Sequence, residues 1–231
     1  MADYPTRYLT GPLGKQVRPK AIEFHQTTFV QAQRTLLQDI TLDIFEGESI
    51  ALLGPPGAGK SALLACVQGL IQPTRGVVRV LGATLPPLPV EIRRQMGVLP
   101  QQLDPAAHET VGTYLQRFAS YYDIHLNSKQ ITTYCTHYEL EPSMQADTLS
   151  SLQARIFAFA LSLVHDPRLV VLDEPLSGLS EPDQNALWFY LQRIQREGRT
   201  LLCTFSVPLA EKYLSGYDLI VRLEQGRLTR Q

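Results

Sequence analysis

The chain has 231 residues, of which 44% are hydrophobic and 19% are charged, and its formal net charge is −1. This length suits one globular core with an inserted or appended lobe, and the charge gives no support to nucleic-acid binding, which usually shows a basic excess. Three widely separated cysteines predict free thiols in a reducing compartment: Cys66, Cys135 and Cys203.

The first segment predicts little regular structure. Residues 1–20 contain five turn-forming residues, Pro5, Gly11, Pro12, Gly14 and Pro19. We therefore expect a loosely ordered N-terminal extension, and the segment lacks the pattern of a secretory leader. Short β-rich runs follow at 21–24 and 40–45, and the alternation within 41–45 predicts a half-buried antiparallel strand.

Residues 54–61 match the phosphate-binding pattern G-x-x-x-x-G-K-[ST]. They read Gly54, Pro55, Pro56, Gly57, Ala58, Gly59, Lys60 and Ser61. Glycines allow backbone N–H groups to surround phosphate oxygens. Lys60 is expected to reach the β- and γ-phosphates, and the Ser61 hydroxyl to bind Mg²⁺. An apolar strand at 48–53 and a helix from residue 61 flank the loop, which favours an anion site over a chance glycine-rich turn.

The segment from about 103 to 150 has helical patterns. Residues 113–122 place Leu115, Phe118, Ala119 and Tyr122 on one face. A second helix is expected over 128–140, with Ser128 as its N-cap. Because this segment offers no strand candidate, we expect a helical lobe inserted into an α/β core.

From residue 151 onward, helices and strands alternate. Helices are expected at 151–164, 182–197 and near 209–214, and strands at 168–173, 200–204, 219–223 and from 227. Pro182 suits the first turn of its helix, and the longest apolar stretch, about 154–164, is far too short to span a membrane. This alternation predicts a parallel sheet with the nucleotide at its carboxyl edge. The expected fold class is α/β: a P-loop NTPase core with a mainly parallel sheet, an N-terminal antiparallel β lobe and the inserted α-helical lobe.

Two carboxylates end the apolar strand at 169–172. In P-loop enzymes such a strand delivers an aspartate that holds Mg²⁺ through water, which is the role expected for Asp173. Glu174 is then placed to orient or deprotonate the attacking water. The alternative is a strand that ends in a solvated turn.

Five segments, taken in order, indicate a family. They are residues 54–61, 96–101, 149–153, 172–175 and 177–179. Together they resemble the motifs of an ABC-type nucleotide-binding domain, and the resemblance covers about residues 21–228. The stretches 92–101 and 109–122 look most like ATPases that are paired with ABC-2-type membrane exporters.

The resemblance implies ATP and Mg²⁺ as ligands. It implies that Gln101 contacts Mg²⁺ and senses a membrane partner through the helical lobe. It also implies that an aromatic residue upstream of the P-loop stacks on adenine. Phe29 is the candidate because its ring offers a π face; the alternative is that Phe29 is a core residue of the β lobe.

The chain departs from the family pattern at several positions. In the family, ATP is sandwiched between the P-loop of one subunit and a signature loop, Leu-Ser-Gly-Gly-Gln, of another. Here residues 149–153 retain Ser150, which still offers a hydroxyl, but carry Ser151 and Leu152 in place of both glycines. Glycine there permits close backbone approach to phosphate, so we expect weakened or abolished activation of the partner's ATP.

Four further positions differ. The inter-subunit aspartate after residues 177–179 is replaced by Ser180, although Glu181 follows and offers a partial substitute. The switch histidine is replaced by Ser206, or by Phe205 if the alignment slips by one. Pro56 and Ala62 also differ from the family's Asn and Thr, but neither change removes a phosphate ligand. Replacement of the switch histidine removes a preorganised hydrogen-bond donor, and loss of one such donor costs roughly 3–4 kcal/mol of transition-state stabilisation in other enzymes.

These features predict the ATP-binding subunit of an ABC exporter with an N-terminal extension at 1–20 and a cassette at 21–231. We expect slow hydrolysis, a separate transmembrane permease, a second nucleotide-binding subunit in a homo- or heterodimer, and a cytoplasmic, peripheral position on the membrane through that permease. The alternative is a regulatory pseudo-ATPase that uses ATP as a dimerisation switch. A soluble ABC protein acting on ribosomes or DNA is disfavoured. The five histidines lack metal-ligand spacing.

Overall fold

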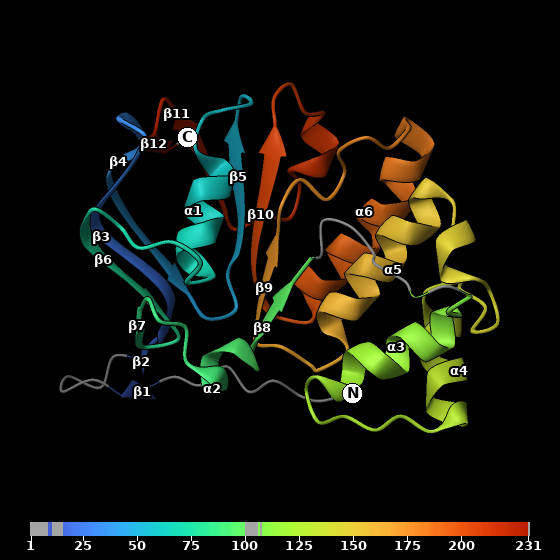
Figure 1. The fold of residues 1–231 in the computed structure, drawn as a ribbon. Helices are drawn as coiled ribbons and strands as arrows, with labels where there is room; N and C mark the ends of the chain where they lie inside the picture. Colours follow the sequence, from blue (N-terminus) through green and yellow to red (C-terminus); the bar gives the residue numbers. More distant parts are fainter. Residues whose placement is uncertain (1–8, 11–15, 100–105, 107, 231) are drawn as a thin grey trace.

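A six-stranded sheet forms the centre of the molecule in the computed structural model, which describes residues 9–10, 16–99, 106 and 108–230 (Figure 1). Its order is β12-β11-β5-β10-β9-β8. The strands are β5 (Ser49–Gly54), β8 (Met96–Val98), β9 (Leu169–Leu172), β10 (Thr200–Ser206), β11 (Leu219–Glu224) and β12 (Arg227–Arg230). All neighbours pair in parallel except β11 and β12. The mainly parallel sheet predicted from the sequence is confirmed.

A second sheet of four antiparallel strands has the order β4-β3-β6-β7. It contains β3 (Lys20–Gln31), β4 (Arg34–Phe45), β6 (Arg75–Val80) and β7 (Ala83–Leu85). The helix α1 (Lys60–Val67) lies between this sheet and β5 (Figure 1). The predicted β lobe is therefore confirmed, but β6 and β7 were missed, and β3 and β4 are longer than the predicted runs. A short antiparallel pair, β1 (Leu9–Thr10) and β2 (Gln16–Val17), precedes it.

The remaining helices lie on the other side of the central sheet (Figure 1). They are α3 (Val111–Ser120), α4 (Ser128–His137), α5 (Ser151–Leu163) and α6 (Glu181–Arg196), with short turns at η1 (Ala146–Thr148) and η2 (Glu211–Tyr213). The short helix α2 (Val90–Arg93) instead lies near β7 and β8, and its Ile92 packs with side chains of α1. Between residues 103 and 150, the segment that we propose as the helical lobe, the described part holds α3, α4 and η1. None of the described helices has the length and apolar character needed to cross a membrane.

Two details of the predicted helices were wrong. The N-cap of α4 is Asn127, whose side chain accepts a hydrogen bond from the Gln130 N–H, so Ser128 is already the first helical residue. The helix expected near 209–214 is only the 3₁₀ turn η2. Ala210 is still extended at ψ 134°, and Gly216 follows with φ +93°, so a single turn fits between them.

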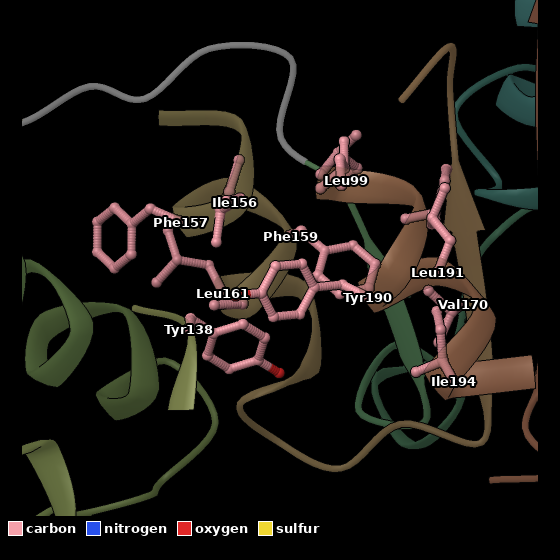
Figure 2. Packing of buried hydrophobic residues seen from close by; sticks show 14 of the residues in the cluster. Leu99, Tyr138, Ile156, Phe157, Phe159, Leu161, Val170, Tyr190, Leu191 and Ile194 are labelled. Carbon is pink, nitrogen blue, oxygen red and sulfur yellow. The ribbon is translucent and has the colours of Figure 1, made fainter. Parts of the chain in front are cut away.

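Apolar packing fixes the helices that carry the candidate motifs. Side chains of α3, α5 and α6 and of the central strands form one cluster, part of which is shown in Figure 2. Leu161 of α5 and Leu191 of α6 are completely buried, and full burial of a leucine contributes about 1.5–3 kcal/mol. A second cluster joins α1 to both sheets. The two clusters hold β5 and β9 at the centre, and both strands are buried along their full length.

Candidate nucleotide-binding site

The loop between β5 and α1 has the backbone of an anion cradle. Gly57 and Gly59 have φ values of +79° and +108°, which side chains with a Cβ rarely adopt. A Cβ on Gly59 would lie 2.4 Å from the Leu36 carbonyl oxygen. Gly59 is also the N-cap of α1 and supplies no side-chain hydrogen bond. The first N–H groups of α1 therefore have no capping side chain and are available to an anion, so the loop fits a phosphate.

Lys60 points back into this loop. Its side chain is 5% exposed, and Nζ donates to the carbonyl oxygens of Gly54 (2.7 Å) and Pro55 (3.1 Å). Nζ also forms an ion pair with Glu174 Oε1 at 3.1 Å. Nζ donates a third, longer hydrogen bond to the Ser206 hydroxyl at 3.4 Å, so the three donor hydrogens of the ammonium are all in use.

Ser61 and Asp173 lie together although 112 positions separate them. The Ser61 hydroxyl donates to Asp173 Oδ2 at 3.1 Å. The second carboxylate oxygen accepts from the Thr204 hydroxyl at 2.6 Å, and the same Thr204 oxygen accepts from the Glu174 N–H at 3.0 Å. Hydroxyl and carboxylate oxygens are the ligands that Mg²⁺ prefers. The donor set therefore fits the Mg²⁺ site that the sequence predicts for Ser61 and Asp173.

Thr204 is a site residue that the sequence reasoning missed. It is completely buried, donates to the Asp173 carboxylate and accepts from the Glu174 backbone N–H at the end of β9. A signal was present: Thr204 is a polar residue near the carboxyl end of a mainly apolar strand. Recognising it required the parallel pairing of β10 with β9, which places their carboxyl ends side by side.

Ser206 holds the carboxylate of Glu174. The Ser206 hydroxyl donates to Oε1 at 2.5 Å, and the Ser206 N–H donates to Oε2 at 3.1 Å. Lys60 Nζ lies 3.4 Å from the same hydroxyl. Glu174 itself has φ +48°, a conformation that a non-glycine residue adopts at a cost. Glu174 is thus fixed between a serine and a lysine.

The two remaining predicted contacts are less defined. Phe29 is half-buried on β3, opposite Leu37, and packs against the cluster around α1. Leu37 Cδ2 lies 3.3 Å from a Cβ built on Gly59, so this part of the β lobe adjoins the P-loop. Its contact with adenine stays a prediction, and the alternative core role stays open. Gln101 lies outside the described residues.

Residues of the signature and inter-subunit loops cap helices. Ser150 is the N-cap of α5: its oxygen accepts from the Gln153 N–H, and Gln153 Oε1 accepts from the Ser150 N–H. Leu152 is half-buried and packs against the large cluster. Ser180 is the N-cap of α6, where its hydroxyl donates to Asp183 Oδ2 at 2.7 Å. Ser150, the predicted signature serine, is exposed, and its oxygen already accepts a hydrogen bond from its own helix.

The chain is similar to known proteins over most of its length. The family model described as ABC transporter matches residues 37–177. The Nod factor export ATP-binding protein I of Neorhizobium galegae is 30% identical over 222 residues, which cover 94% of this chain and 63% of the relative. The corresponding protein of Rhizobium meliloti is 30% identical over 226 residues, with coverage of 94% and 67%. The chain thus spans about two thirds of the length of these relatives.

Solved structures show the same fold. A dimeric ATP-binding cassette in a post-hydrolysis state, bound to ADP and Pi, superposes with a TM-score of 0.75 at 21% identity, covering 90% of this chain and 98% of that one. An ATP-binding cassette of an ABC transporter in its ADP conformation gives a TM-score of 0.79 at 16% identity, with coverage of 92% and 91%.

Proposed function

The chain belongs to the ABC transporter family, and from this membership we propose that it is an ATP-binding subunit that hydrolyses MgATP slowly to drive a separate membrane permease of an exporter. The observation that carries the proposal is the convergence of Lys60, Ser61, Asp173 and Glu174 at one end of the central sheet. The exporter assignment is supported by the similarity to Nod factor export ATP-binding proteins.

The contacts of Lys60 define what the site must do when ATP binds. Lys60 exchanges its ion pair with Glu174 for phosphate oxygens, because its three donor hydrogens are already in use. Glu174 then becomes free to accept a proton from the attacking water. Ser61 and Asp173 would hold Mg²⁺, which neutralises charge on the phosphates. Ser206 remains within reach of Glu174 and takes over the orientation of its carboxylate.

The partners follow from the family. We propose that a second nucleotide-binding subunit completes the ATP site, and that a transmembrane permease docks on the segment we assign as the helical lobe, residues 103–150. Such a subunit lies in the cytoplasm, peripheral to the membrane through that permease. The division into an extension at 1–20 and a cassette at 21–231 is part of this proposal. The dimeric state of a structural neighbour supports a paired cassette.

A regulatory pseudo-ATPase is the second candidate. It is favoured by the capping box at Ser150, because this box already engages the backbone N–H groups of Ser150 and Gln153 and so leaves fewer donors for a partner's ATP. Retention of Glu174, with a defined hydrogen-bonded carboxylate, favours hydrolysis.

Titration calorimetry with MgATP and single-turnover hydrolysis, each with and without the permease, test the proposal. Saturable binding together with permease-stimulated turnover is the expected result. Tight binding without turnover would replace it by the pseudo-ATPase, and absence of binding would refute both.

Restoring the signature glycines is expected to increase turnover. In the double variant Ser151→Gly, Leu152→Gly, removal of both Cβ atoms permits the close approach that the family's loop makes. We expect at least a tenfold faster steady-state rate in the assembled transporter. Two glycines in the first turn of α5 also cost about 1 kcal/mol each relative to alanine, so thermal unfolding is measured in parallel.

The matched control is Ser151→Ala, Leu152→Ala. It removes the bulk and apolar packing of Leu152 but retains both Cβ atoms. If this variant accelerates hydrolysis as much as the glycine pair, steric approach of the backbone is not the reason for slow turnover.

Substituting Ser206 with histidine is a second route to faster hydrolysis. Histidine supplies a donor at the position where the family has one, and a single preorganised donor is worth about 10²–10³ in rate elsewhere. We expect Ser206→His to exceed the wild-type single-turnover rate and Ser206→Ala to fall below it, because alanine loses the 2.5 Å hydrogen bond to Glu174. Equal rates for alanine and wild type would show that the hydroxyl does not orient the carboxylate.

A further inference from the structure

A cavity of about 600 Å³ lies between α4, α5 and α6. This volume falls within the range of about 300–1,000 Å³ that is typical of small-molecule sites. Its walls come from helices distant from the P-loop: α4, within the proposed helical lobe, supplies one side, and α5 and α6 supply the other (Figure 1). No residue assigned to the nucleotide site lines it.

The floor of the cavity is aromatic. Tyr134, Tyr138, Phe159 and Tyr190 line it. The ring centroids of Tyr138 lie 5.2 Å from Tyr134 and 5.6 Å from Tyr190. Figure 2 shows Tyr138, Phe159 and Tyr190 beside one another. The Tyr134 hydroxyl donates to the Ala160 carbonyl oxygen at 2.6 Å, so it is already satisfied. Burial raises the pKa of Tyr134 and Tyr138, which keeps both phenols neutral at physiological pH. The floor therefore suits a flat apolar ligand.

The rim of the cavity carries a positive excess. Three cations line it, Lys129, Arg193 and Arg199, against two carboxylates, Asp166 and Glu197. Both carboxylates already bind arginines: Glu197 pairs with Arg193 and Arg199, and Asp166 pairs with Arg199. Lys129 is exposed and forms no ion pair with any residue that the structure describes.

His137 adds no charge to this balance at neutral pH. Its pKa is lowered, chiefly by burial and secondly by Arg193, although Glu197 opposes the shift. The uncompensated charge at the rim is therefore that of Lys129, which complements one negative group on a ligand.

We propose that this cavity binds a small planar aromatic molecule that carries one carboxylate or sulfonate. The aromatic body lies on the tyrosine floor, and the anionic group faces Lys129. Because α4 belongs to the proposed helical lobe while α5 and α6 pack against the central sheet, a bound ligand contacts both parts. The site is separate from the nucleotide site, and its occupation does not depend on the proposed ATPase activity.

The test uses a pair of fluorescent probes that differ by one charged group. 8-Anilinonaphthalene-1-sulfonate is the anionic probe, and N-phenyl-1-naphthylamine is its uncharged counterpart. Each is titrated into the full-length protein and excited directly, so that added tryptophans do not contribute. We expect saturable binding of the sulfonate with one site per chain, and weaker binding of the uncharged amine.

Two matched variants on α4 locate the probe. Thr133 is exposed and lines the cavity, whereas Thr136 is exposed on the same helix and does not line it. We expect Thr133→Trp to fill the cavity and weaken sulfonate binding by at least about tenfold, or 1.4 kcal/mol, while Thr136→Trp binds like the wild type. Circular dichroism and thermal unfolding confirm that both variants fold.

The charge variant Lys129→Glu tests the anionic group. It is expected to weaken the sulfonate by about tenfold and to leave the uncharged amine unchanged. Equal sulfonate affinity in Thr133→Trp and Thr136→Trp, or no saturable binding to the wild type, would overturn the proposal. So would equal losses for both probes in Lys129→Glu. If the cavity instead receives a peptide side chain of a partner, neither probe is expected to bind to the wild type.

Discussion

Replacing Lys60 with alanine is expected to abolish measurable ATP binding. Lys60 is buried within the P-loop, and its ammonium is the only cation that the structure places against both Glu174 and the carbonyl oxygens of Gly54 and Pro55 among the described residues. The same ammonium is expected to pair with the phosphates of ATP, and removing one partner of a buried, hydrogen-bonded charge pair costs about 2–5 kcal/mol of binding free energy. A loss of 3 kcal/mol corresponds to about a hundredfold weaker binding. Titration calorimetry with MgATP measures it.

Lys129→Ala is the matched control, because Lys129 is an exposed lysine on α4, away from the P-loop. It should bind ATP with wild-type affinity. Thermal unfolding of the Lys60 variant without nucleotide separates loss of binding from loss of fold, since alanine leaves the Glu174 carboxylate without its cation. A folded Lys60→Ala protein with unchanged affinity would refute the site assignment.

Local sequence patterns predicted the elements best where one strong signal determined them. The glycine spacing of residues 54–61 was sufficient to predict a strand, a loop and a helix in that order. The loop needs glycine because residues with a Cβ rarely adopt the positive φ of Gly57 and Gly59. The apolar run before Asp173 was sufficient to predict a buried strand. By contrast, β6 and β7 were missed because they have only six and three residues, with a positive-φ glycine, Gly76, inside β6 and a turn at Gly82 between the two strands, so neither run shows a recognisable alternation.

The contacts within the site were not predictable from local patterns. Thr204 and Ser206 reach Asp173 and Glu174 only because β10 pairs in parallel with β9 at a fixed register. A shift by one residue would point both side chains to the opposite face of the sheet. The sequence indicated that Ser206 replaces a histidine, but only the structure shows two hydrogen bonds from it to one carboxylate.

Two of the departures from the family pattern share a physical feature with the retained Ser150. The hydroxyl groups of Ser150, Ser180 and Ser206 are all engaged within their own chain: the first two cap α5 and α6, and the third binds Glu174. In the family these loops serve contacts with ATP or with a second subunit. Such local hydrogen bonds must be given up or shared when a partner approaches, which is consistent with the slow hydrolysis that we propose.

Glu174→Gln is expected to separate binding from hydrolysis. Glutamine has nearly the same shape and can still accept from the Ser206 N–H, but it cannot take a proton from water. Loss of a positioned general base lowers the rate by about 10²–10⁴. Because glutamine also removes the negative charge that occupies Lys60, ATP affinity should stay the same or increase. Single-turnover hydrolysis and calorimetry on the same preparation measure the two effects.

Glu91→Gln provides the control, since Glu91 is an exposed carboxylate on α2 that belongs to neither the nucleotide site nor the inter-subunit loops. It should retain the wild-type rate. If Glu174→Gln retained it too, Glu174 would not be the base. If wild type, with its permease present, were as slow as Glu174→Gln, the base would be present but unused. ATP would then act by holding two subunits together. Lys60 can exchange Glu174 for phosphate oxygens, and so bind ATP, whether or not hydrolysis follows.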